Sequence, residues 1–462
     1  RAVSAVGLSD RLDIDPPIHW RLIDRFVAED GQPDPYPSAF FDAPLRRAIE
    51  AGRVEEALLD EKVRRILALS ERLGVTATAG TPADRSIDWD AHHDLAREIA
   101  VRGTVLLAND GVLPLRGGET LAVVGPNADE AKIGGGGSSE VTPPHSVSPV
   151  DGLRERAQSV TFERGIDRLP NPSMFDMPWT GLARSLRSQA DIEAAREAAA
   201  AADVAVVVVQ DVATEGEDRD GMALPSEQNR LVSAIADANP RTVVVCRSSG
   251  PVEMPWAEAV AAIVQTWYPG QAEGEALGAV LYGDDPGGRL PVTYGHSFEE
   301  YPVADERRYP GVDGQVHYEE GVFVGYRGFD RAGVDPLFPF GHGQSYATFE
   351  YDDLAIERVA GGLDVSLRVR NVSNRAGREV VQAYVSPPET AADRPERELG
   401  GSRTVQLTAG DSRRVSLAIP ERALARYDER TGWTIDPGEY EVTVGRSSRD
   451  GRAIERLTLD GS

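Results

Sequence analysis

The chain has 462 residues, of which 41% are hydrophobic, and its 75 acidic and 49 basic side chains give a net charge of −26. This length exceeds one ordinary core and predicts two or three domains, and the hydrophobic fraction is typical of a globular protein. An acidic surface repels phosphate backbones, so nucleic acid is excluded as an expected partner. No apolar run reaches the ~18–20 residues that span a bilayer, so no membrane is expected.

Residue usage says something about the environment of the protein. The first residues, Arg1–Asp10, lack the basic and then apolar layout of a secretory signal, which favours a cytoplasmic location. Lys62 and Lys132 are the only lysines, a bias that fits either a GC-rich genome or adaptation to salt. Cys246 is the single cysteine, so no internal disulfide and no cysteine-based metal site can form. It lies in an apolar run and is predicted to be a buried, inert thiol.

Residues 1–76 predict helices without a sheet of their own. Apolar residues recur at helical spacing from Leu59 to Leu73, and Gly74 ends the pattern. A single amphipathic stripe cannot bury itself, so this segment is expected to pack on something else.

Residues 77–345 predict an α/β sandwich with a mostly parallel sheet. Continuous β-branched runs alternate with helical segments, as parallel strands covered on both faces do. In such sheets, binding and catalytic residues gather on loops beyond the C-terminal ends of the strands. The predicted helices are 94–107, 192–202, 227–238 and 272–281, and the predicted strands are 121–124, 204–209, 242–246 and 260–266.

Residues 346–462 predict an all-β domain. The helical signal stops near Phe349, and Leu363–Arg370 alternates between apolar and polar residues. Similar short strands are expected at 380–385, 403–407, 414–419 and 440–444. Strands of this length and spacing favour a β-sandwich.

Four consecutive glycines, Gly134, Gly135, Gly136 and Gly137, follow the first strand of the predicted sheet. They do not form a phosphate-binding loop, because no Gly-Lys-Ser/Thr follows and the spacing is not that of a dinucleotide fingerprint. The run instead predicts a loop that lets the backbone approach another domain or a ligand closely.

An acidic loop, Asp211–Asp220, follows the apolar run 204–209. A solvated turn is one interpretation in so acidic a chain. The other is a catalytic loop, since crowded carboxylates raise the pKa of at least one member and so provide a proton donor near neutral pH. Arg219 can hold a neighbouring carboxylate ionised.

Many motifs, in order and over nearly the whole chain, resemble family 3 of the glycoside hydrolases. The acidic loop is the most specific, since Glu215, Gly216, Asp218 and Arg219, followed by Leu224-Pro225 and Gln228, match the family's signature. The end of the chain looks like the family's fibronectin type III-like domain. The other matching segments are 103–115, 123–128, 135–138, 148–149, 267–271, 283–284, 288–293, 318–321, 324–327 and 336–343.

The resemblance implies a fold and a site. In the family, a (β/α)₈ barrel carries the nucleophilic Asp and the α/β sandwich supplies the general acid/base, which corresponds to Glu215. Glu217 occupies a variable position, Asp218 and Arg219 shape the loop, and the loop 134–137 lines the mouth of the pocket. Residues 1–76 then correspond to the helices that end a truncated barrel, and no cofactor or metal is implied.

The nucleophile has no recognisable counterpart in the sequence. Ser9-Asp10 is weakly similar to the family's Ser-Asp-Trp motif, but Arg11 replaces the Trp and the usual spacer is missing, so Asp10 is interpreted as a loop residue. The chain is therefore expected to be nearly inactive alone, its barrel being lost or carried by a partner chain.

The implied function is that of a retaining, exo-acting β-glucosidase that acts on a β-linked oligosaccharide or glycoside. A β-xylosidase or another exo-glycosidase is the alternative within the enzymes. A non-catalytic sugar-binding or scaffold homologue is the alternative outside them.

Overall fold

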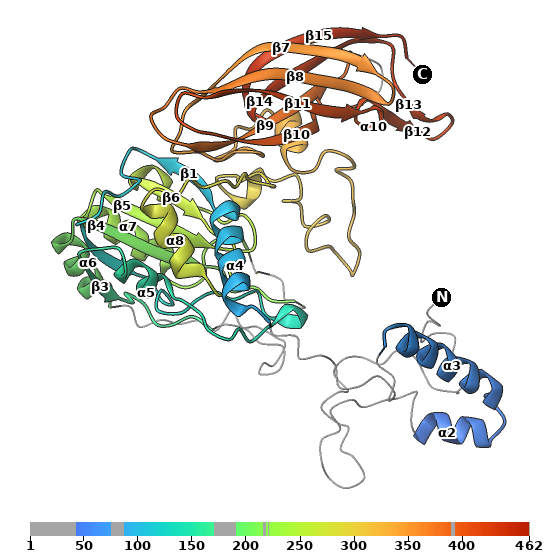
Figure 1. Ribbon diagram of the computed structural model, residues 1–462, viewed down its shortest axis with the longest axis horizontal. Helices are drawn as coiled ribbons and strands as arrows, with labels where there is room; N and C mark the ends of the chain where they lie inside the picture. The colour runs from blue at the N-terminus through green and yellow to red at the C-terminus, as the bar shows by residue number, and fades with distance from the viewer. Residues whose placement is uncertain are drawn as a thin grey trace. The chain divides into compact units, whose positions relative to one another are not determined.

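The computed structural model describes residues 43–74, 87–170, 191–215, 219, 221–389 and 393–461. It divides the chain into two compact units, Arg1–Asp88 and Trp89–Ser462, which are drawn together in Figure 1.

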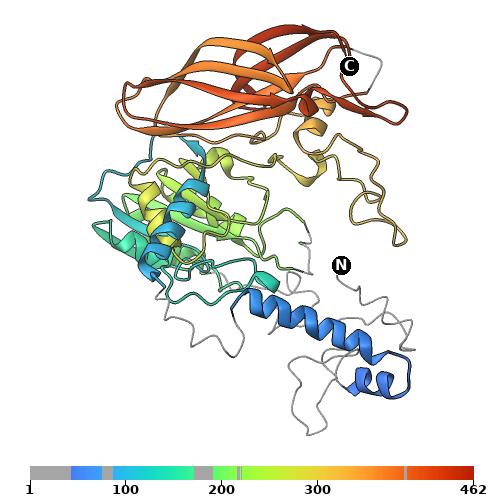
Figure 2. The same ribbon diagram turned by 45° about the vertical axis from the view of Figure 1, so that its right-hand side comes forward.

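The first unit is described by two helices, α2 (Ala43–Glu50) and α3 (Glu56–Arg72), joined by a short turn (Figure 2). Ala48 and Val54 form a small buried cluster beside the turn, whereas α3 buries none of its residues. The helical spacing seen in the sequence is confirmed, but its apolar side chains are exposed. Assignment of these helices to the end of a barrel stays a prediction. None of the helices in the described ranges is long and apolar enough to cross a membrane.

The second unit begins with the predicted α/β sandwich. In its described residues, six strands pair in the order β1-β6-β5-β4-β2-β3, and all pairs are parallel except that of β1 with β6. The strands are β1 (Val105–Asn109), β2 (Thr120–Val124), β3 (Ser159–Glu163), β4 (Val204–Gln210), β5 (Thr242–Arg247) and β6 (Ala262–Gln265).

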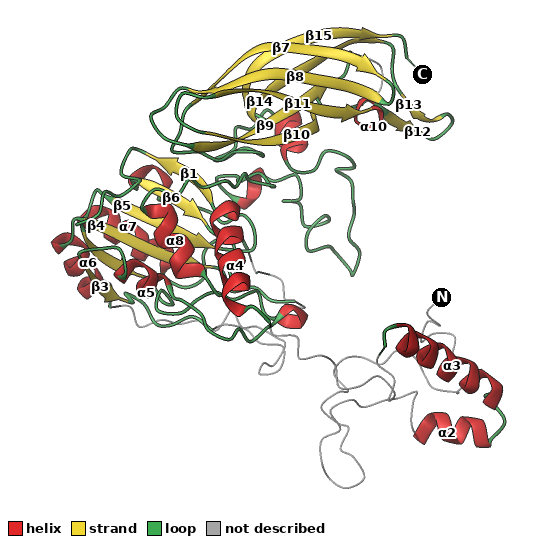
Figure 3. Cartoon of the chain, in the orientation of Figure 1, coloured by secondary structure: helices red, strands yellow, loops and turns green. Residues whose placement is uncertain are grey.

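Helices cover both faces of this sheet (Figure 3). On one face, α6 (Ile192–Ala201) and α7 (Gln228–Ala238) pack against side chains such as Val207 and Val244. On the other face, α5 (Pro149–Arg154) and α8 (Glu273–Leu281) pack against the alternate side chains of the same strands. The helix α4 (Trp89–Gly103) packs on α8 through Ala100 and Val101. Burial on both faces explains why the central strands are continuous apolar runs. Cys246 lies inside this core, as predicted.

One predicted helix is wrong at its end. The helix expected over 94–107 starts earlier, at Trp89, and ends at Gly103, and residues from Val105 onward form the edge strand β1. Pairing of β1 with β6 uses residues about 160 positions away. Because that pairing is absent from the local pattern, the apolar run by itself predicts a continuation of the helix.

The C-terminal part is the predicted β-sandwich. Its described strands form one sheet in the order β10-β9-β14-β15 and another in the order β11-β8-β7, with a separate β12-β13 hairpin. The two sheets enclose a core of side chains such as Val365, Val381 and Val442. The elements are β7 (Phe349–Val359), β8 (Gly362–Asn371), β9 (Gly377–Ser386), β10 (Glu398–Leu407), β11 (Ser412–Pro420), α10 (Glu421–Leu424), β12 (Arg426–Asp428), β13 (Gly432–Thr434), β14 (Gly438–Ser447) and β15 (Asp450–Leu459).

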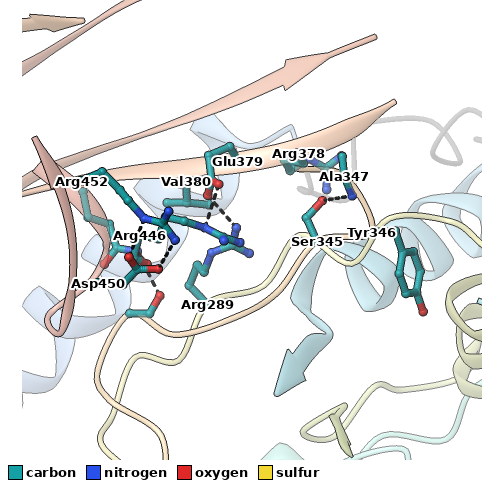
Figure 4. A network of polar contacts seen from close by, with 12 residues as sticks. Arg289, Ser345, Tyr346, Ala347, Arg378, Glu379, Val380, Arg446, Asp450 and Arg452 are labelled. Atoms are coloured by element: carbon teal, nitrogen blue, oxygen red, sulfur yellow. Dashed lines mark hydrogen bonds and ion pairs between the residues drawn. The ribbon is translucent and has the colours of Figure 1, made fainter. Parts of the chain in front are cut away.

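Ion pairs of buried carboxylates join the sandwich to the segment that follows the α/β sheet (Figure 4). The carboxylate of Glu379, on β9, is fully buried and lies 2.8 Å from Arg289 and 3.0 Å from Arg446. Asp330, on α9 (Tyr326–Ala332), is paired in the same way with Arg397 at 3.2 Å and Arg449 at 2.8 Å. Arg289 and Asp330 belong to the segment after α8, so their pairs with Glu379, Arg397 and Arg449 fix the sandwich to that segment.

Candidate active site

Three neighbouring parallel strands, β4, β5 and β6, end at the same edge of the sheet. Asp211 follows β4, Ser249 follows β5 and Tyr268 follows β6. The carboxylate of Asp211 is almost fully buried. It accepts hydrogen bonds from the Tyr268 hydroxyl at 2.6 Å and from the Ser249 N–H and hydroxyl at 2.8 Å each. This is the carboxyl edge of the sheet, where α/β proteins place their binding sites.

Glu215 lies at this edge, on the loop after β4, and its side chain is exposed. It borders a cavity of about 430 Å³. Among the described residues that line the cavity, Glu215 is the only carboxylate. The other lining residues are Gly135, Gly136, Ser139, Ala213, Thr214, Arg219, Ser249 and Tyr268.

The carboxylate of Glu215 is held by Ser138. The backbone N–H of Ser138, in the short helical turn Gly137–Ser139, donates to Oε2 of Glu215 at 2.6 Å. Hydrogen bonds from the side chain and then the backbone of Ser138 lower the pKa of Glu215 below its ordinary value, because they favour the charged form. The carboxyl with a raised pKa that the crowding of this loop predicts is therefore not Glu215. The other acidic residues nearby, Glu217, Asp218 and Asp220, lie outside the described residues.

The glycine loop, residues 134–137, packs closely on both sides of this site. Gly137 has a φ of +66°, and a Cβ on it would lie 2.4 Å from Cβ of Glu215. A Cβ on Gly135 would lie 3.0 Å from Cε2 of Tyr268. The glycines do allow a close approach of the backbone, but to Glu215 and Tyr268 of the same domain. The predicted approach to another domain or a ligand stays a prediction.

A buried ion pair fixes the start of the glycine loop. Glu273, the first residue of α8, accepts the backbone N–H of Lys132 at 2.6 Å and lies 3.3 Å from the guanidinium of Arg247. Burial raises the pKa of Glu273, and Arg247 partly offsets this. Arg247 also donates to the carbonyl oxygens of Asn127 at 3.0 Å and Glu130 at 2.9 Å. The chain between β2 and the glycines is thereby anchored to the sheet edge.

The fold and this site agree with one family of known proteins. The profile of the glycosyl hydrolase family 3 C-terminal domain matches residues 104–326, and that of the fibronectin type III-like domain matches residues 379–448. The crystal structure of DesR, a β-glucosidase from Streptomyces venezuelae in complex with D-glucose, is similar with a TM-score of 0.80 and 32% identity. That similarity covers 94% of this chain and 68% of the other. This chain belongs to family 3 of the glycoside hydrolases.

Two curated members of the family are also similar over most of this chain. Thermostable β-glucosidase B from Acetivibrio thermocellus is 35% identical over 96% of the chain. Exo-α-(1→6)-L-arabinopyranosidase from Bifidobacterium breve is 33% identical over 92% of the chain. In each case the match spans 56% of the relative, so this family 3 chain spans little more than half the length of these relatives.

Some of the predicted site residues of this family 3 chain line one cavity, some lie outside it, and some are not described. Glu215, Arg219, Gly135 and Gly136 line one cavity, and Gly137 contacts Glu215 from beside it. A Cβ added to Gly134 would meet open space, and Gly134 is absent from the cavity lining. Glu217, Asp218 and Asp10 lie outside the described residues. The acid/base role of Glu215 stays a prediction.

Arg219 was expected to hold a neighbouring carboxylate ionised. Its Nη1 lies 4.0 Å from Oδ2 of Asp211 and donates to the carbonyl oxygen of Pro251 at 2.9 Å. The carboxylate that it faces is therefore the buried Asp211.

In the described ranges, no three His, Cys, Asp or Glu side chains are grouped so that they could hold a metal ion.

Sequence reasoning missed Ser138, Ser249, Tyr268 and the role of Asp211. Tyr268 belongs to the segment 267–271 that resembles the family, but no sequence pattern connects it with the acidic loop. The backbone of the structure does mark this segment, because Trp267, next to Tyr268, has a φ of +61°. Such a conformation is costly for a bulky residue and marks a functional or tightly constrained turn.

Proposed function

We propose that this chain supplies the general acid/base, Glu215, of a retaining exo-acting β-glucosidase. The observation that carries the proposal is the exposed carboxylate of Glu215, the only one among the described residues that line a cavity at the carboxyl edge of a family 3 sheet. The similarity of the chain to two β-glucosidases supports the choice of substrate class. A substrate would be a β-linked oligosaccharide or glycoside with its glycosidic oxygen within reach of the Glu215 carboxyl.

The two protonation states of Glu215 serve different steps. In the first step a protonated carboxyl donates to the departing oxygen, and in the second the carboxylate removes a proton from the attacking water. The hydrogen bonds from Ser138 favour the carboxylate, which suits the second step. Proton donation requires the pKa of Glu215 to rise when the glycoside enters. The proton can then occupy Oε1, while Oε2 keeps its hydrogen bond from the Ser138 N–H.

A retaining mechanism needs a second carboxylate roughly 5–5.5 Å from the first. The described lining of the cavity contains no carboxylate besides Glu215. We therefore propose that a barrel supplies the nucleophile. This barrel would lie on sequence outside these 462 residues or on a partner chain. Alone, the chain would be nearly inactive, because acid/base help by itself is worth only about 10²–10⁴-fold.

Exposed apolar side chains on α3 support such a partner. A helix of 17 residues with no buried side chain gains little from packing and is marginal in water. Clusters of exposed apolar residues commonly mark interaction surfaces. On α3 and just beyond it, the residues are Leu58, Val63, Ile66, Leu67, Leu69 and Leu73.

Another exo-glycosidase is the second candidate. The arabinopyranosidase of Bifidobacterium breve is nearly as similar to the chain as the β-glucosidases are. The choice between glucoside, xyloside and arabinopyranoside depends on contacts to the sugar ring, which we place on the proposed barrel.

The test is the variant Glu215→Ala in an enzyme completed with the barrel. Turnover of substrates with poor leaving groups should fall by about 10²–10⁴-fold. Dinitrophenyl glycosides should lose much less in the glycosylation step, and added azide should speed release of their glycosyl intermediate. Glu193→Ala, which removes an exposed carboxylate from α6, is the matched control and should leave turnover unchanged. Unchanged kinetics in Glu215→Ala would remove Glu215 from the mechanism and leave a sugar-binding homologue as the better account.

A further inference from the structure

We propose that Tyr268 is a positioning residue for Glu215, since it ties the acidic loop to the glycine loop and so directs Ser138 at the Glu215 carboxylate. The role rests on the proposed function of Glu215, but the geometry can be tested without substrate. Nothing in the acid/base chemistry requires Tyr268 to touch the sugar.

The first link is the hydrogen bond between Tyr268 and Asp211. The Tyr268 hydroxyl donates to Asp211 at 2.6 Å, and burial together with the Asp211 carboxylate raises the pKa of Tyr268, so that it remains a donor. Asp211 cannot move freely, because Ser249 binds its other oxygen through two hydrogen bonds. The ring of Tyr268 is therefore fixed to the end of β4, four residues before Glu215.

The second link is the contact of the Tyr268 ring with the glycine loop. The space where Gly135 would carry a Cβ is closed by the ring edge, 3.0 Å away. The ring also lies under the ammonium group of Lys132, whose Nζ is 4.9 Å from the ring centroid. Lys132 is buried and its pKa is lowered, chiefly by burial. The ring thus contacts Gly135 in the glycine loop and Lys132, two residues before the loop.

The third link is the contact of the glycine loop with Glu215. Three residues beyond Gly135, the Ser138 N–H donates to Glu215 at 2.6 Å, while Gly137 packs on the Glu215 side chain. A shift of the glycine loop would move the Ser138 donor away from the carboxylate. Movement of the loop toward the Tyr268 ring is blocked as long as the ring and its hydrogen bond to Asp211 stay in place.

Hydrogen exchange at the Ser138 amide tests this arrangement in the full chain. A hydrogen bond to a carboxylate is strong enough to slow exchange by about tenfold or more. Glu215→Ala removes the acceptor and should raise the exchange rate by about that factor. Tyr268→Phe keeps the ring but removes the donor to Asp211, and it should give most of the same increase.

Two alanine variants one residue apart provide a matched pair. Gly135→Ala places a methyl group against the Tyr268 ring and should speed Ser138 exchange, whereas Gly134→Ala adds the same group in open space and should not. Tyr346→Phe, which removes a hydroxyl bonded to the Val280 carbonyl oxygen at 2.9 Å, controls for the loss of a buried hydroxyl. If Tyr268→Phe fails to fold, the glycine pair still decides the question.

The proposal is overturned if Gly135→Ala and folded Tyr268→Phe both exchange at the wild-type rate, or if Glu215→Ala leaves Ser138 exchange unchanged. It is supported if both variants resemble Glu215→Ala while Gly134→Ala and Tyr346→Phe resemble wild type. Because exchange needs no substrate, failure here leaves the azide test of Glu215 intact, and failure of the azide test leaves the exchange result intact.

Discussion

Carboxylates at two regions of the second unit are held in different ways. At the junction with the β-sandwich, Glu379 is fully buried between Arg289 and Arg446. At the carboxyl edge of the sheet, Glu215 is exposed and, among the described residues, is held by hydrogen bonds from Ser138.

The difference separates structural from chemical use of the same functional group. A carboxylate buried between two cations is costly to unpair, because removing one partner leaves an uncompensated charge. An exposed carboxylate that is held by hydrogen bonds, and not by buried cations, can gain a proton without leaving a buried charge uncompensated. Only the second arrangement suits proton transfer to a ligand.

The largest expected effect concerns Glu379. Glu379→Ala leaves Arg289 and Arg446 facing each other without an anion, and it should lower the free energy of unfolding by about 3–5 kcal/mol. Glu441→Ala, which breaks a partly exposed pair with Arg456 on β14 and β15, is the matched control and should cost at most about 1 kcal/mol. Urea-induced unfolding of the full chain measures both. Equal losses in the two variants would show that burial of the junction pair has no special weight.

The same variant separates the two regions. Glu379→Ala should leave hydrogen exchange at the Ser138 amide unchanged as long as the chain is folded, because no contact connects the junction to the glycine loop directly. A faster Ser138 exchange in Glu379→Ala would show that the two regions are coupled and would break the comparison.

A smaller effect is the opposite pH dependence of two carboxyls. The pKa of Glu215 is lowered by Ser138, so its contribution to stability is present above the unfolded value of about 4.3 and is lost as the pH falls through the lower folded value. The pKa of Asp330 is raised, chiefly by burial, against the effect of Arg397 and Arg449. Its contribution therefore decreases as the pH rises from about 3.9 through the raised folded value.

Paired variants measure these signs. Glu215→Gln should remove a rise in stability with pH, and Asp330→Asn should remove a fall, when unfolding is followed between about pH 3 and 7. Slopes of the same sign in the two variants would contradict the assignment.

Local patterns in the sequence predicted much of this fold. Continuous β-branched runs such as Val204–Val209 predicted the buried parallel strands, and the alternation in Leu363–Arg370 predicted the sandwich, because both patterns record burial on the element itself. The edge strand β1 was missed, since its pairing with β6 is set by residues far along the chain.

The candidate site shows the same limit. Glu215 and the glycine loop were found from the sequence, but Tyr268 reaches Asp211 across 57 positions and Ser138 reaches Glu215 across 77. The direction of the Glu215 pKa depends on that second contact. No local feature of the acidic loop shows that a backbone donor will reach it.

The most direct test of the account is covalent labelling with an activated 2-deoxy-2-fluoro-β-glucoside, which traps the glycosyl ester of a retaining enzyme on its nucleophile. When the chain is completed with a barrel, the account predicts that mass spectrometry of peptides will find the ester on a barrel carboxylate and on none of residues 1–462. A glycosyl ester on any carboxylate of this sequence, Asp10 included, would contradict it.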